Sequence, residues 1–269
     1  MSSTPLTKRL LATSAVTLAL ALGATSAVAV TVSGHRGATA VAGVPENSSK
    51  AFYQAIASGA AVLETDVRWT QDDRMVILHD NTLDRTTHCT GPVEAITYAA
   101  LRTCAPAHVV QDFASVLHHA KTKGVTLNPE IKSVPAYPFT AAKAQAYVTE
   151  INAHAMSERT VVSSFDTAVL ALVREQAATG LRFSLITDSR GAVTPEEARA
   201  QGTIYMPRYT TLTQESVEAY HEAGLEIWGW GAANTEEEFA AMVALGVDVI
   251  VADDPRRATN YLRSHASTS

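Results

Sequence analysis

From residue 110 onward, two kinds of apolar segment alternate along the chain. Longer segments with apolar positions three or four apart indicate helices, whereas short runs rich in valine and isoleucine indicate strands. We expect helices at 111–123, 139–154, 166–178, 194–201, 213–223, 235–245 and 254–264. Strands are expected between them at 125–131, 160–164, 182–187, 203–207, 225–230 and 247–252. This alternation predicts a parallel sheet.

Two further strands precede this regular part of the chain. Residues 30–33 and 61–67 are expected to be strands, separated by a helix that begins near Asn47 and Ser48 and stops at Gly59. The total of eight strand–helix units in about 240 residues is the size of a closed (β/α)8 TIM barrel. An open doubly wound sheet is the alternative, but no G-x-G-x-x-G sequence follows the first strand.

The segment after the second strand departs from this alternation. Asp72 and Asp73 separate two extended runs, which predicts a hairpin rather than another barrel strand at 75–78. Such a hairpin returns His79 to the end of the second strand. Residues 81–108, which contain both cysteines, are expected to form a short irregular insertion.

Residues 1–29 have the pattern of a signal peptide. They combine a basic start, an apolar stretch at 10–24 and a small-x-small cleavage site at 27–29. The apolar stretch is shorter than a comfortable membrane span, so an uncleaved anchor is the alternative we favour less. We expect residues 30–269 to be secreted, into the extracellular or the periplasmic/cell-wall space, without stable membrane insertion.

The charge balance and the cysteines narrow the class of protein further. The formal net charge is −6, and it is −8 without residues 1–29, because these contain Lys8 and Arg9 and no acidic residue. This balance argues against nucleic acid or an anionic membrane surface as the main partner. In an exported chain Cys89 and Cys104 are expected to form a disulfide, with two free thiols as the alternative.

Polar and aromatic side chains gather where the expected strands end. Active sites of such barrels lie at the carboxyl ends of the strands. Side chains two residues apart in a strand share a face, so Glu64 and Asp66 lie side by side, as do Glu130 and Lys132. The residues that we expect at this end of the barrel are His35, Arg36, Glu64, Asp66, His79, Glu130, Lys132 and Trp230.

These side chains suit a phosphate-ester site that contains one divalent cation. Glu64, Asp66 and Glu130 offer oxygen ligands to Ca²⁺ or Mg²⁺, and Glu46 is a further candidate ligand. The alternative for any one of them is a salt bridge to a neighbouring basic residue, Arg36 or Lys132. Burying the whole set without a cation would be costly.

The remaining groups could bind substrate and move protons. His35 and His79 could act as a base and an acid, because imidazole titrates near pH ~6.5. Arg36 and Lys132 would hold the non-bridging phosphate oxygens. Trp230 is a candidate substrate contact.

The ordered motifs resemble those of glycerophosphodiester phosphodiesterases. The segments that carry the resemblance are His35-Arg36-Gly37, Pro45-Glu46-Asn47, Glu64-Thr65-Asp66-Val67, His79-Asp80, Leu83-Asp84-Arg85-Thr86-Thr87, Glu130-Ile131-Lys132, Gly246-Val247-Asp248 and Asp253-Asp254-Pro255. The resemblance implies a TIM barrel that hydrolyses small-molecule glycerophosphodiesters to glycerol 3-phosphate and an alcohol, using Ca²⁺ or Mg²⁺. It also implies that the substrate's own glycerol hydroxyl attacks first and that water opens the resulting cyclic phosphate.

The resemblance assigns roles by position and leaves one wall of the site different. It makes Glu64, Asp66 and Glu130 metal ligands, His35 and His79 the acid/base pair, and Arg36 and Lys132 phosphate contacts. Near residue 230 the family usually has one tryptophan, whereas Trp228 and Trp230 are both present in this chain.

Two other functions remain open at this stage. A phospholipase D-like lyase on the same barrel would share both histidines and the Glu-x-Asp pair and would release a cyclic phosphate. The Glu46-Asn47 and 84–87 elements favour the hydrolase. A non-catalytic barrel that binds phosphodiesters or cell-wall polymers would not need two proton carriers.

Overall fold

The computed structural model describes Met1 and residues 30–177, 179–189, 191–231 and 235–265. In these residues, eight parallel strands close into a barrel. Their bounds are β1 Thr31–Gly34, β2 Val62–Trp69, β4 Thr126–Ile131, β5 Val161–Ser164, β6 Arg182–Thr187, β7 Ile204–Pro207, β8 Glu226–Gly229 and β9 Val249–Ala252. The barrel closes where β1 pairs with both β2 and β9. The predicted (β/α)8 TIM barrel is confirmed.

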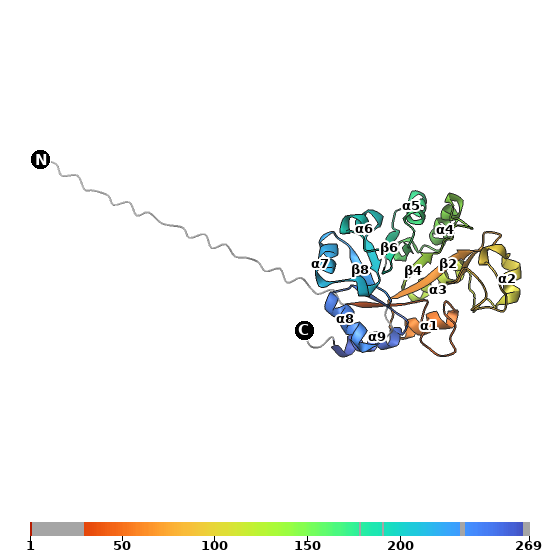
Figure 1. Ribbon diagram of the computed structural model, residues 1–269, viewed down its shortest axis with the longest axis horizontal. Coiled ribbons are helices and arrows are strands. Elements are labelled where there is room, and N and C mark those ends of the chain that lie inside the picture. The colour runs from red at the N-terminus through yellow and green to blue at the C-terminus, as the bar shows by residue number, and fades with distance from the viewer. Residues whose placement is uncertain (2–29, 178, 190, 232–234, 266–269) are drawn as a thin grey trace.

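Helices surround the strands, and Figure 1 shows them as a ring around the barrel. They are α1 Ser49–Ala57, α3 Phe113–Lys123, α4 Ala141–Ala153, α5 Thr167–Gln176, α6 Pro195–Gln201, α7 Gln214–Glu222, α8 Glu236–Leu245 and α9 Pro255–His265. Ser48 caps α1 and Asp112 caps α3, each by accepting a hydrogen bond from a backbone N–H of the first turn. Short 3-10 turns precede β5 and follow β7 at η2 Ser157–Arg159 and η3 Tyr209–Thr211.

Apolar side chains fill two layers of the barrel. One layer lies between the helices and the outer faces of the strands. The other lies inside the barrel and consists of Val62, Val161, Ile186, Ile204, Met206, Trp228, Val249 and Val251. Because side chains alternate along a strand, Glu64 and Asp66 follow Val62 on the inward face of β2. At the carboxyl end of the barrel, charged side chains therefore lie next to the apolar layer that fills the interior.

The hairpin after β2 is present as predicted. The short strand β3 Met75–Ile77 pairs antiparallel with the end of β2 and does not join the barrel. Leu78 N–H donates to the carbonyl of Asp66, so the chain returns to the end of β2. This return places His79 at the mouth of the barrel.

The insertion at 81–108 contains more regular structure than the irregular segment we expected. It includes the 3-10 helix η1 Val93–Ala95 and the helix α2 Tyr98–Cys104, which lies at the edge of the molecule in Figure 1. Thr97 caps α2, and Leu101 and Cys104 turn one face of it toward a separate apolar cluster. The prediction missed this helix because seven residues are too few for a clear periodic pattern.

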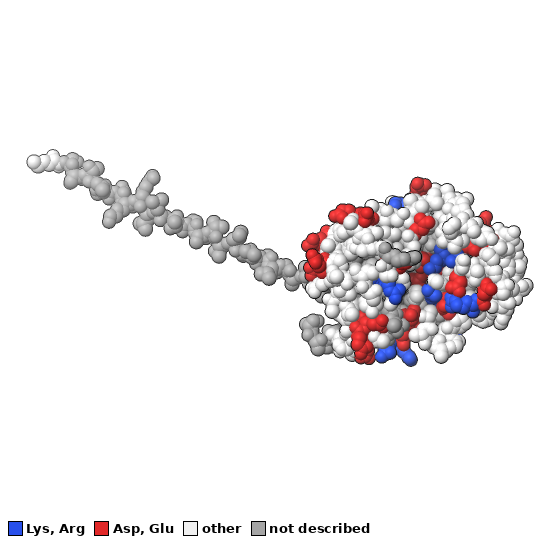
Figure 2. Space-filling model, in the orientation of Figure 1, with Lys and Arg blue, Asp and Glu red and all other residues white. Residues whose placement is uncertain are grey.

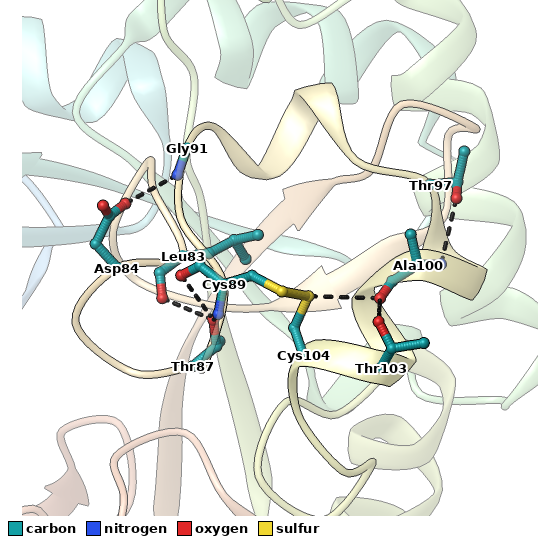
Figure 3. Close-up of a disulfide and its surroundings, with 9 residues drawn as sticks. All are labelled: Leu83, Asp84, Thr87, Cys89, Gly91, Thr97, Ala100, Thr103 and Cys104. Carbon is teal, nitrogen blue, oxygen red and sulfur yellow. Dashed lines mark hydrogen bonds between the residues drawn. A yellow bond between two sulfur atoms is a disulfide. The ribbon is translucent and has the colours of Figure 1, made fainter.

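The predicted disulfide joins Cys89 to Cys104 within this insertion, as Figure 3 shows. It ties the loop before η1 to the end of α2. The predicted signal peptide lies outside the described residues, apart from Met1. Among the helices that the structure describes, none combines the length and the apolar character needed to cross a bilayer.

Candidate active site

The turn after β1 fixes the first histidine of the site. After His35, Arg36 and Gly37 turn the chain with φ values of 53° and 90°. A Cβ atom on Gly37 would lie 2.7 Å from the backbone of Ala51 in α1, so this close approach requires glycine. The Arg36 N–H donates to Glu64 Oε2 over 2.7 Å. His35 is therefore held beside the end of β2.

Three carboxylates meet at the ends of β2 and β4. Glu64 and Asp66 share the inward face of β2, and Asp66 pairs in register with Glu130 on β4. All three are buried, and one oxygen of each lies within 4.8 Å of the others. Lys132 Nζ lies 3.1 Å from Asp66 Oδ1 and 2.6 Å from Glu130 Oε1. The expected acidic cluster is thus present, and the ammonium group of Lys132 lies beside it.

The surroundings of the cluster shift the pKa values of its carboxyl groups in opposite directions. Burial, together with the charge of Asp66, raises the pKa of Glu64 to about 8. Burial also raises the pKa of Glu130, although Lys132 opposes it. The pKa of Asp66 lies well below its usual range, because positive neighbours, above all Lys132, outweigh its burial.

The donor set suits a hard divalent cation. Three buried carboxylates can ionise together only if more positive charge is added than Lys132 and its neighbours supply. Carboxylate oxygens are the ligands that Ca²⁺ and Mg²⁺ prefer in proteins. Glu64, Asp66 and Glu130 therefore have the chemistry to hold one such cation.

Each of the two histidines is held by a carboxylate. His35 Nδ1 lies 2.5 Å from Asp253 Oδ1, and His79 Nδ1 lies 2.8 Å from Asp80 Oδ1. A carboxylate fixes a protonated Nδ1, which leaves Nε2 of each ring to exchange a proton. Although burial disfavours its charged form, Asp253 and Glu64 raise the pKa of His35. Burial lowers the pKa of His79.

The charged groups line one side of a pocket of about 140 Å³, and apolar side chains line the other. The apolar side consists of Phe165, Ile186, Met206, Trp230 and Val251. Trp230 Nε1 donates to the carbonyl of Thr187 over 3.0 Å, and its ring meets Phe165 edge-on with centroids 5.9 Å apart. Figure 2 shows lysine and arginine side chains gathered around the hollow in the middle of the molecule.

The structure places all the expected site residues in this pocket or in the acidic cluster, with one exception. Glu46, expected as a further metal ligand, lies outside the cluster that the structure brings together. Its Oε1 accepts from Arg36 over 3.2 Å, and Arg85 donates to both of its oxygens over 2.7 Å. The structure thus shows the alternative that the sequence left open, a salt bridge to Arg36.

Three residues around the pocket received no role from sequence reasoning. Asp253 follows β9, so its position at a strand end was the available signal. Phe165 follows β5 in the same way, but a single aromatic residue has no characteristic spacing. Arg85 reaches Glu46 across 39 residues of chain, and no local pattern predicts that contact.

Comparisons with known proteins show which enzymes this chain resembles. Residues 35–257 match the model of the glycerophosphoryl diester phosphodiesterase family. A glycerophosphodiester phosphodiesterase from Caldanaerobacter subterraneus subsp. tengcongensis is 31% identical over 241 residues, which are 85% of this chain and 96% of that protein.

Solved structures give the same result for the fold. A family structure from Silicibacter pomeroyi DSS-3 has a TM-score of 0.78 at 27% identity and covers 89% of this chain and 95% of that chain. An Oleispira antarctica phosphodiesterase, solved with its product sn-glycerol-3-phosphate, has a TM-score of 0.78 at 19% identity, covering 87% of this chain and 96% of that chain. The chain therefore belongs to the glycerophosphoryl diester phosphodiesterase family, and glycerophosphodiester hydrolysis is its activity.

Proposed function

We propose that this chain is an exported, divalent-cation-dependent enzyme that releases glycerol 3-phosphate and an alcohol from glycerophosphodiesters. In this proposal His35 and His79 carry the protons. The main observation in support of this proposal is the position of the acidic cluster. Its three buried carboxylates have oxygens within 4.8 Å of one another. They lie beside a pocket that is lined by both histidines, Arg36 and Lys132. The Oleispira phosphodiesterase of the same fold was solved with sn-glycerol-3-phosphate, which supports this choice of product.

The acidic cluster would hold the cation. Glu64, Asp66 and Glu130 each offer an oxygen, and burial together with the charge of Asp66 raises the pKa of Glu64, so added positive charge would favour its ionised form. When bound, a hard cation would act as a Lewis acid toward the phosphate group of the substrate.

The two histidines would move protons on opposite sides of the reacting phosphorus. One Nε2 would accept the proton of the attacking glycerol hydroxyl of the substrate, and the other would donate a proton to the oxygen of the departing alcohol, which leaves a cyclic phosphate. Water would then open this ring with the two proton transfers reversed, which gives glycerol 3-phosphate and restores both histidines. Asp253 and Asp80 hold the rings in the tautomer that this requires. This division of labour explains why both rings line one pocket.

The cationic side chains would stabilise the phosphate, and the apolar wall would hold the carbon part of the substrate. Arg36 and Lys132 line the pocket beside the cluster, where low solvent access strengthens their attraction for phosphate oxygens. Trp230 lies on the opposite wall and offers a rigid apolar surface. A glycerophosphodiester has both kinds of chemistry in one small molecule.

Export is supported by two features of the chain. Residues 1–29 have the composition of a signal peptide. The Cys89–Cys104 disulfide suits an oxidising compartment outside the cytoplasm. N-terminal sequencing of the protein recovered from the medium or cell wall should begin at Val30; recovery only from the cytoplasm with an intact N-terminus would contradict export.

Phosphorus NMR of the purified protein with glycerophosphocholine tests the activity and the cation together. Glycerol 3-phosphate should form with added Ca²⁺ or Mg²⁺, should stop with chelator, and should be lost in both His35→Ala and His79→Ala. A cyclic phosphate that accumulates as the end product would favour the lyase. A folded protein without turnover on any diester would favour the non-catalytic barrel.

A further inference from the structure

The guanidinium group of Arg85 lies between two carboxylates, each of which holds a residue of the active site. Its Nη1 and Nη2 donate to Glu46 over 2.7 Å. Its Nε and Nη2 donate to Asp80 over 2.6 Å and 3.0 Å. Arg85 is absent from the residues found to line the pocket and from the acidic cluster of the described chain. It therefore contacts the supports of the site and not the site itself.

We propose that Arg85 is a positioning residue for the hydrolysis, aligning His79 through Asp80 and Arg36 through Glu46. This inference rests on the proposed function, because it takes His79 as a proton carrier and Arg36 as a phosphate contact.

The first arm of the network runs to His79. Asp80 Oδ1 accepts hydrogen bonds from both His79 Nδ1 and Arg85 Nη2. The Asp80 side chain is a quarter exposed, so without Arg85 water would compete for its oxygens and the carboxylate could rotate away. The planar fork of an arginine fixes both oxygens of a carboxylate at once. The orientation of the His79 ring therefore depends indirectly on Arg85, because Asp80 contacts both residues.

The second arm runs to Arg36 in the same way. Glu46 Oε1 accepts from Arg36 Nη1 over 3.2 Å and from Arg85 Nη2 over 2.7 Å, while Oε2 accepts from Arg85 Nη1. Glu46 belongs to the loop between β1 and α1, and Asp80 follows β3. One guanidinium group thus joins two loops that are separate in the sequence, and each loop supports one residue on the charged side of the pocket.

The segment that carries Arg85 is itself firmly held. Leu83 is buried, its N–H donates to the carbonyl of Gly91 over 2.9 Å, and Thr87 Oγ1 donates to the Leu83 carbonyl over 2.8 Å. The Cys89–Cys104 disulfide anchors the same turn to α2, as Figure 3 shows. Arg85 therefore projects from a cross-linked turn rather than from a free loop.

A second set of hydrogen bonds, through Arg68, connects the insertion to His79. Arg68 on β2 donates from Nε and Nη2 to the His79 carbonyl over 3.1 Å and 3.0 Å. Its Nη1 donates to Glu94 of η1 over 3.1 Å, and both side chains of this ion pair are buried. The insertion thus supports the His79 backbone through the Glu94–Arg68 ion pair and the His79 ring through the Arg85–Asp80 ion pair. The insertion at 81–108 would thus have the function of positioning His79, although it lies at the edge of the molecule.

Steady-state kinetics of the full protein with glycerophosphocholine and saturating Ca²⁺ separates the two arms. Asp80→Asn should lower kcat about 10- to 100-fold with little change in KM, because a misaligned proton carrier affects the chemical step. Glu46→Gln should mainly raise KM, because Arg36 then holds the phosphate less well. Arg85→Ala should do both.

The matched control is Arg102→Ala. Arg102 lies in α2 of the same insertion, and its hydrogen bond goes to the carbonyl of Val110 over 2.7 Å rather than to Glu46 or Asp80. Its loss tests whether any damage to the insertion reduces activity, so kcat and KM should stay at wild-type values. An equal loss in Arg102→Ala and Arg85→Ala would overturn the positioning role.

Two further measurements distinguish positioning from general destabilisation. The double variant Arg85→Ala/Asp80→Asn should have a kcat no lower than the worse single variant, because both act through His79. Millimolar guanidinium ion should partly restore kcat to Arg85→Ala and not to Asp80→Asn. Fully additive losses, or no response to guanidinium, would overturn the proposal.

The two proposals fail in different ways. No cation-dependent turnover by the wild type would remove the proposed function and this inference with it. A wild type that turns over, with His79→Ala inactive and Arg85→Ala unchanged, would remove only the role of Arg85.

Discussion

The two walls of the pocket come from different parts of the barrel and are stabilised in different ways. The charged wall uses the ends of β1, β2 and β4, where Glu64, Asp66 and Glu130 are held by ion pairs and hydrogen bonds across the strands. The apolar wall uses the ends of β5 to β9, where Met206 is held by packing and Trp230 by packing and one hydrogen bond to Thr187. In the proposed function, the charged wall therefore acts on the phosphate group, and the apolar wall contacts the carbon skeleton of the substrate.

The apolar wall also affects the charged one. Apolar side chains exclude water, and Coulomb interactions between the groups opposite become stronger as the effective dielectric constant falls. Burial raises the pKa of Glu64, and at the equally buried Asp66 the charges of Lys132 and its neighbours outweigh burial and lower the pKa. The two walls therefore differ in composition but depend on each other electrostatically.

The largest effect should come from the charged wall. Asp66→Asn removes the one carboxylate of the cluster whose pKa is strongly lowered, and with it a charge that a cation would bind. Loss of several kcal/mol of transition-state stabilisation corresponds to a fall in kcat/KM of roughly 10³-fold. The steady-state rate with saturating Ca²⁺ measures this.

The control for that change is Asp73→Asn. Asp73 is exposed in the turn of the hairpin that follows β2, with a positive φ that asparagine tolerates well. The same chemical change there should leave the rate unaltered. Activity of Asp66→Asn within a few-fold of wild type would mean that the charged wall does not depend on this carboxylate.

The affinity of the charged wall for a cation should rise with pH. Without a cation the pKa of Glu64 is raised to about 8, so between about pH 6 and 8 binding must displace its proton. For one displaced proton, apparent binding should tighten about tenfold from pH 6 to 7 and about fivefold from pH 7 to 8, where the pH reaches the pKa. Calorimetric titration with Ca²⁺ at pH 6, 7 and 8 measures it, and a pH-independent affinity would contradict the shifted pKa.

The charged wall could be predicted from the sequence, and much of the apolar wall could not. Period-2 alternation alone puts Glu64 and Asp66 on one face, and the hairpin signal at Asp72 and Asp73 returns His79 to them. Both predictions rest on local rules that tertiary contacts did not override.

The rest of the site depends on contacts between distant parts of the chain. Glu46 was expected to bind the cation, but Arg85 and Arg36 compete for its oxygens from loops that only the folded barrel brings together. Phe165 and Met206 become one wall only after the barrel closes. The short helix α2 was missed because its stability comes from the insertion's own apolar cluster rather than from a long periodic pattern.

A change on the apolar wall should have a smaller effect and a different kinetic signature. Trp230→Ala removes apolar contact area and the hydrogen bond to Thr187, so KM should rise about tenfold while kcat stays near the wild-type value. Trp230→Phe should recover most of the affinity. A fall in kcat equal to the rise in KM would show that this wall also orients the reacting groups.

The smallest effect tests whether the two walls act separately. Phe165 is 45% exposed, its ring touches Trp230, and Lys132 Nζ lies 5.9 Å from its centroid. Phe165→Leu keeps an apolar side chain but removes the ring face that attracts the ammonium ion. Because such exposed cation–π contacts contribute only about 0.5 kcal/mol, KM should rise about twofold and kcat should not change.

Tyr53→Leu is the control, because Tyr53 is an exposed aromatic residue on α1 that is not among the residues lining the pocket. A tenfold loss of kcat in Phe165→Leu alone would mean that this ring sets the position of Lys132, and the two walls would then be one catalytic unit.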